Sequence, residues 1–155
     1  TGGGHALACG VGVKDEEYEN FVRFMHEKSK DIIRKPERVD FELSLSDLSK
    51  SLVRSLETLA PFGAGNSVPV ILLNDCFVTD IMFFGNDKKH LKLAIEYMGN
   101  RQFAIFWNAK NTLLGDYLSS NVLGKTLSLV TTISMNEKFT SNPIDIIIKD
   151  VVERV

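Results

Sequence analysis

The chain opens with three glycines followed by a histidine, the residues whose types and spacing point most directly to chemistry. Gly2, Gly3, Gly4 and His5 continue into a small apolar segment, residues 6–13. Glycine has no Cβ, so neighbouring backbone N–H groups can approach an anion closely, and a histidine adds a donor or a titratable group. A flexible linker could begin in the same way, but it would not need to continue into apolar sequence and an amphipathic helix. We therefore take Gly3, Gly4 and His5 as a candidate phosphate-binding site.

A second set of candidates lies in the C-terminal half, where basic and aromatic residues are interleaved. The net charge is −2, yet residues 88–138 contain seven basic and three acidic residues. Single-stranded nucleic acids are bound by cations along the backbone and by aromatic rings under the bases, although scattered lysines are also common on solvated strands. Alternation along a strand places Phe106 and Trp107 on opposite faces, so at most one of them is exposed. The candidates are Lys88, Lys89, Lys92, Arg101, Phe106, Trp107 and Lys110.

The composition is that of a globular domain and excludes several classes of protein. The chain has 155 residues, of which 44% are hydrophobic and 25% charged, enough for one domain or two small ones. No apolar run could span a bilayer, so we expect no membrane partner. Cys9 and Cys76 lie too far apart to indicate a disulfide framework or a zinc site, which favours the cytoplasm. The chain starts at Thr1 without a methionine, and we read it as a piece of a longer protein.

Hydrophobic periodicity predicts the elements that must position these residues. Apolar residues three and four apart predict a helix over 15–34, and alternation predicts a strand over 38–43. A second helix is expected to start at Ser46 as N-cap and to end at Pro61. Residues 61–69 contain two glycines and two prolines, a composition that indicates a boundary between two units.

After Pro69 the pattern changes to short strands. Strands are predicted over 70–73, 76–84, 89–95, 102–107, 126–134 and 145–152, with a short helical turn at 117–120. Five or six strands with one helix before the last two favour a five-stranded Greek-key barrel of the OB type. The predicted fold class is therefore α+β, with a mixed helical and β unit over 1–66 and an OB-like barrel over 67–155.

Three segments carry a resemblance to a known family. Residues 2–10 are similar to the glycine–histidine motif of the DHH-associated domain, close to GGGHxxAAG, with Cys9 where alanine is more common. Residues 59–66 resemble the segment L-x-P-F-G-x-G-N that ends that domain, and residues 133–137 and 146–150 resemble paired strands near the end of the family's OB domain. Over nearly its whole length the chain resembles the C-terminal part of the RecJ single-strand-specific exonucleases, within the DHH phosphoesterase superfamily.

The resemblance implies that hydrolysis and DNA binding lie in different parts of the enzyme. In this family an upstream domain holds two divalent metals, manganese or magnesium, on Asp and His side chains, and these activate water. This chain has three histidines and no Asp-His-His run, so it should contain no catalytic residue, need no cofactor of its own and be inactive alone. It would be the part of a 5'–3' exonuclease of DNA repair and recombination that binds single-stranded DNA, with Gly3, Gly4 and His5 holding a phosphate. A helicase or a single-strand-binding protein are further expected partners.

Two alternatives stay open at this point. The OB-like unit could be a noncatalytic interaction module, since OB folds serve many functions. The chain could also belong to another DHH-type phosphoesterase that acts on short oligonucleotides or cyclic dinucleotides, which the β unit after residue 66 disfavours. Binding of a single strand that weakens with salt would support a DNA-binding fragment of an exonuclease. An exposed apolar patch without a basic groove would support the interaction module.

Overall fold

The computed structural model describes residues 2–5, 8–29, 38–138 and 142–152. The chain forms two compact units, residues 1–36 and 37–155, which are considered separately below. This division lies earlier than the expected boundary between residues 66 and 67. The reason is that the strand and helix that follow residue 37 pack onto the β-structure of the second unit. No helix in the described ranges is long and apolar enough to cross a membrane.

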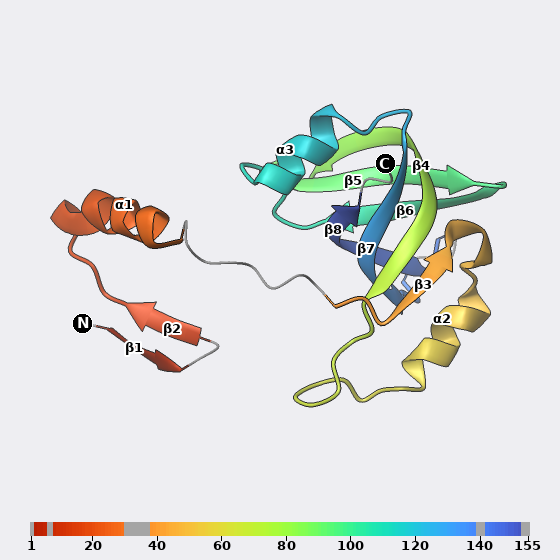
Figure 1. Ribbon diagram of the computed structural model, residues 1–155, viewed down its shortest axis with the longest axis horizontal. Helices are drawn as coiled ribbons and strands as arrows, with labels where there is room; N and C mark the ends of the chain where they lie inside the picture. Colours follow the sequence, from red (N-terminus) through yellow and green to blue (C-terminus); the bar gives the residue numbers. More distant parts are fainter. Residues whose placement is uncertain (1, 6–7, 30–37, 139–141, 153–155) are drawn as a thin grey trace. The chain divides into compact units, whose positions relative to one another are not determined.

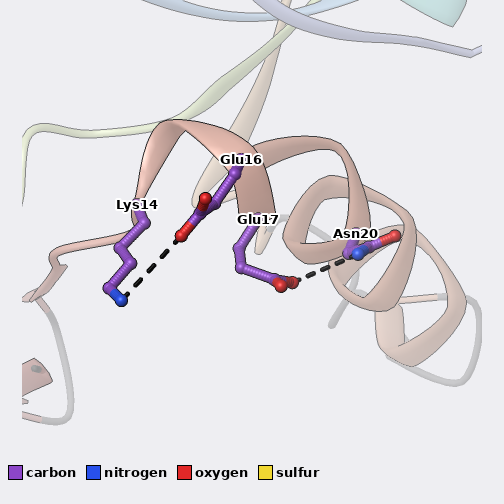
Figure 2. Close-up of polar contacts among 4 residues, drawn as sticks. All are labelled: Lys14, Glu16, Glu17 and Asn20. Atoms are coloured by element: carbon purple, nitrogen blue, oxygen red, sulfur yellow. Dashed lines mark hydrogen bonds and ion pairs between the residues drawn. The ribbon is translucent and has the colours of Figure 1, made fainter.

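The first unit contains a hairpin and a helix. β1 (Gly2–His5) pairs antiparallel with β2 (Ala8–Val11), with Gly3 opposite Gly10. A 3₁₀ turn, η1 (Asp15–Glu17), leads into α1 (Tyr18–Ser29). Figure 2 shows two contacts at the start of this helix: Lys14 Nζ lies 3.9 Å from Glu16 Oε1, and Asn20 Nδ2 donates to Glu17 Oε2 at 3.1 Å. The helix predicted over 15–34 is confirmed as far as residue 29, and its last residues lie outside the described ranges.

The second unit begins with a strand and a helix that precede the barrel. β3 (Phe41–Ser44) is followed by the 3₁₀ turn η2 (Leu45–Asp47) and by α2 (Lys50–Glu57). The prediction that Ser46 caps this helix was wrong, because Ser46 lies inside η2. The hydroxyl of Ser49 accepts from Leu52 N–H at 3.3 Å and is the N-cap of α2.

The barrel is built from five strands and one helix. They are β4 (Ile71–Phe84), β5 (His90–Tyr97), β6 (Asn100–Phe106), α3 (Leu113–Ser120), β7 (Thr126–Met135) and β8 (Ile144–Val152). The sheet order is β3-β4-β5-β6-β8-β7, and an additional pairing of β4 with β7 closes the last five into a barrel. β6 and β8 are parallel, and the other neighbours in the barrel are antiparallel. Figure 1 shows α3 and α2 at different ends of this barrel.

β4 is one long strand where two were predicted. The turn signal Asn74-Asp75 produces a bulge instead of a break: Asp75 has a φ of 62°, and the register with β7 shifts between Leu73 and Cys76. A bulge bends a strand and increases its twist. β4 pairs with β3 before the bulge, with β7 on both sides of it as far as Phe77, and with β5 from Phe77 onward.

The barrel interior is filled by aliphatic side chains from every strand and from α3. Leu73, Leu93, Ile146 and Leu118 are fully buried. Cys76 is buried among them, and desolvation, together with the nearby charge of Asp75, raises the pKa of its thiol to about 12. Cys76 is therefore a packing residue.

We predict that Gly115→Ala destabilises the protein, because α3 lies directly against a backbone carbonyl. An added Cβ at Gly115 would collide with the carbonyl oxygen of Ala109 and crowd Thr112 Oγ1, the cap of α3. Overpacking of this kind costs about 1–3 kcal/mol of unfolding free energy, measurable by urea denaturation. Ser120→Ala, at an exposed position of the same helix, should change stability by less than about 0.5 kcal/mol. Equal stability of the two variants would contradict the packing described here.

Candidate nucleic-acid interface

The outer face of β5 and β6 carries the candidate site. Leu91, Leu93 and Ala104 point into the core and are fully buried. Their neighbours in sequence alternate outward, as strand geometry requires. Lys92 lies opposite Ile105, and Phe103, on the same outer face, is 38% exposed. An apolar inner face and a basic, aromatic outer face thus belong to the same two strands.

Three rings gather where β4, β5 and β6 meet. The centroid of His90 lies 5.4 Å from that of Phe84 and 4.7 Å from that of Trp107, and the Phe84 and Trp107 centroids are 5.7 Å apart. His90 Nδ1 accepts the backbone N–H of Asn108 at 3.0 Å, so in the neutral ring the proton resides on Nε2. This bond fixes the imidazole plane. Trp107 remains 47% exposed and offers part of its ring to solvent.

Lys92 places a cation between two of the aromatic residues. Its Nζ lies 5.0 Å from the centroid of Phe103 and 5.8 Å from that of Phe84. Such cation–π contacts contribute about 0.5–1 kcal/mol at exposed sites. They hold the ammonium over the sheet, where it can also meet a phosphate.

These residues line a hollow of about 420 Å³, here called the aromatic hollow: Phe84, Lys92, Phe103, Ile105, Trp107, Asn136, Asn142, Ile144 and Asp145. One wall comes from the sheet and the other from the connection between β7 and β8. The single carboxylate in this set, that of Asp145, accepts from Asn136 Nδ2 at 2.8 Å. The lining therefore combines ring faces, a cation and amide groups, the set of groups that suits a base and its phosphate.

The structure brings four of the predicted residues to one end of the sheet. Lys88 and Lys89 lie in the β4–β5 connection, and Lys110 N–H donates to the carbonyl of Lys89 at 3.1 Å. Trp107 follows the end of β6. The Lys89 ammonium also lies 3.7 Å from Asp87 Oδ2, an exposed ion pair.

The alternation argument for the two aromatic residues at the end of β6 is confirmed. Phe106 packs against the core, and Trp107 is the exposed one. Arg101 lies at the other end of β6 and does not line the aromatic hollow. Sequence reasoning missed Phe84 and Phe103. Alternation counted back along the strand from Trp107 could have found Phe103, four residues earlier on the same face.

Gly3 and Gly4 lie in the hairpin of the first unit, and the side chain of His5 is outside the described part of the structure. A Cβ built on Gly3 or Gly10 meets no atom within 4 Å. At these two cross-strand positions the hairpin therefore presents bare backbone, which a ligand could approach closely. Their role in phosphate binding stays a prediction.

A metal site requires several ligands within reach of one ion. In the described ranges, no three His, Cys, Asp or Glu residues lie close enough together to hold a metal.

A closed five-stranded barrel in the order 1-2-3-5-4-1, with a helix between its third and fourth strands, defines an OB fold, and its second and third strands form the surface on which OB folds bind oligonucleotides. The sequence model of the RecJ OB domain family matches residues 39–150. The chain therefore belongs to the RecJ OB domain family.

The chain is also similar to individual proteins. The chain is 24% identical over 153 residues to the single-stranded-DNA-specific exonuclease RecJ of Bacillus subtilis, covering 96% of this chain and 19% of that protein. The structure resembles RecJ of Thermus thermophilus in complex with Mn²⁺, with a TM-score of 0.53, 18% identity and coverage of 100% of this chain and 22% of that one. It also resembles a putative aspartyl-tRNA synthetase from Leishmania major (TM-score 0.50, 11% identity, 88% and 27% coverage). The last two likenesses concern the fold alone.

We predict that Gly85→Ala disturbs the ring cluster. Gly85 has a φ of 90°, and a Cβ there would lie 2.9 Å from His90 Cδ2, so the substitution strains the turn and displaces the imidazole. Trp107 is the single tryptophan, and its emission spectrum should therefore shift. Gly99→Ala is the matched control, because its φ is 79° but its Cβ would meet no atom within 4 Å. Both variants should lose about 1–2 kcal/mol of stability, and an unchanged spectrum in Gly85→Ala would refute the described packing.

Proposed function

We propose that the barrel binds single-stranded DNA through the outer face of β5 and β6, as the substrate-binding module of a RecJ-like exonuclease. The observation that carries this proposal is the aromatic hollow, in which the Lys92 ammonium lies over the rings of Phe84 and Phe103, and the exposed ring of Trp107 lines the same hollow. Stacking accepts any base, because every base has a π-face, and the lysine neutralises the backbone. Family membership and the match to a single-stranded-DNA-specific exonuclease support the same ligand.

The proposal assigns the exonuclease activity to a longer enzyme and not to these residues. The chain spans about a fifth of the Bacillus subtilis relative. We therefore place metal-dependent hydrolysis, with manganese or magnesium, outside these residues, and a role in DNA repair and recombination with the longer enzyme. In that enzyme the barrel would hold the strand while another domain cleaves it.

Trp107→Ala should weaken binding of a fluorescently labelled oligothymidylate. Loss of one stacked base costs about 1–3 kcal/mol, which corresponds to about 5- to 150-fold in Kd, measured by anisotropy at low salt. Leu113→Ala is the control, because Leu113 is 92% exposed and lies at the start of α3. The wild type should also show a log–log salt slope of about −0.7 for each phosphate contacted.

Absence of binding by the wild type at low salt would overturn the proposal. A barrel that binds no single strand but forms a stable complex with a protein of the repair machinery would support the noncatalytic interaction module.

We propose that the glycine–histidine hairpin also contacts the single-stranded DNA. We expect His5→Ala, made in a longer chain that includes the metal-binding domain, to lower nuclease activity at unchanged thermal stability, because the imidazole would hold a phosphate near the cleaved bond. His26→Ala, a histidine of α1, serves as the control. Full activity of His5→Ala would remove the hairpin from the mechanism.

A further inference from the structure

A second hollow continues from the first along β6. It has a volume of about 360 Å³, and its walls include Ser49, Lys50, Arg101 and Gln102. Phe103, Asn142 and Ile144 line both this hollow and the aromatic hollow. The two therefore adjoin at Phe103 and form one groove that runs from the end of β6 at Trp107 to its beginning at Arg101.

The second hollow differs from the first in its chemistry. Its charged side chains are Lys50, the first residue of α2, and Arg101, an exposed residue of β6. Neither makes an ion pair with any residue in the described ranges. No carboxylate belongs to the lining. Two unpaired cations at one end of a groove that carries stacking rings at the other are suited to an anion on the same ligand.

The wall that carries Lys50 is held rigidly against the sheet. Asn100 Nδ2 donates to the carbonyls of Leu45 and Leu48, at 2.8 and 3.0 Å. Glu57 Oε1, at the other end of α2, accepts the N–H of Met135 at 2.9 Å. α2 is thus fixed to the barrel at both ends, and Lys50 lines the same hollow as Arg101.

We infer that Lys50 and Arg101 bind a backbone phosphate of the single strand whose bases stack in the aromatic hollow, so that α2, a helix outside the OB barrel, forms part of the DNA site. This inference rests on the proposed function. It adds a second subsite and a path for the DNA, which would run along β6. Phe103, shared by both hollows, separates the stacked base from that phosphate. A protein partner would need acidic side chains at the same spacing, whereas a nucleic acid supplies phosphates along its whole length.

The test compares two lengths of oligothymidylate on the full chain. A strand of about 12 nucleotides can fill both hollows, and one of about 4 fills the aromatic hollow alone, within the range of site sizes of OB folds. The double variant Lys50→Gln/Arg101→Gln should bind the long strand about tenfold more weakly, with a salt slope about 1.4 smaller in magnitude if each cation contacts one phosphate. Binding of the short strand should be unchanged.

Lys125→Gln/Lys149→Gln is the matched control, since both lysines are exposed and the same charge is removed elsewhere. Long-strand affinity and salt slope equal to wild type in the Lys50/Arg101 variant, with Trp107→Ala still impaired, would overturn the second subsite and leave the proposed function intact. Equal losses for both lengths, or equal losses in the control, would also overturn it, because they would show a general effect of charge. A wild type that binds neither strand would overturn the proposed function instead.

Discussion

The pairing of β4 with β7 is the constraint on which the rest of this unit depends. It converts an open sheet into a closed barrel, so that the strands between them no longer present free edges. The pairing runs from Ile71 to Phe77 of β4, and the bulge at Asp75 shifts its register between Leu73 and Cys76. Closure gives β5 and β6 one face inside the barrel and one outside, and the outer face is free to carry binding residues.

The division of β5 and β6 into two faces separates stability from function. Leu91, Leu93 and Ala104 fill the interior and would be required whatever the barrel bound. Lys92, Phe103 and Trp107 contribute little to that core, yet they define the aromatic hollow. Since OB folds serve many functions, the outer residues and the family assignment, rather than the architecture, support single-stranded DNA as the ligand.

The elements before the barrel are more than a connection. β3 extends the sheet by pairing parallel to β4. Side-chain hydrogen bonds join β3 to β4 and α2 to β7. Asn74 shows how closely they are joined: its amide donates to Glu42 of β3 at 3.2 Å, and its carbonyl oxygen accepts from Ser128 of β7 at 2.7 Å. Buried polar groups satisfied in this way specify one arrangement. The second unit therefore starts well before the proline-rich segment that composition alone had marked as a boundary.

Local pattern was sufficient for most elements and for part of the site. Alternation and periodicity predicted the helix at α1, the barrel strands and the opposite orientations of Phe106 and Trp107. They could do so because an element buried on one face repeats its apolar residues with the period of a helix or a strand. The sequence could not show that Asn74-Asp75 bends a strand instead of ending it, nor that Phe84, from another strand, joins His90 and Trp107. It also could not show that Lys50 and Arg101 line one hollow. These features arise from pairings between distant strands and from the packing of α2, and their register is decided only when the barrel closes.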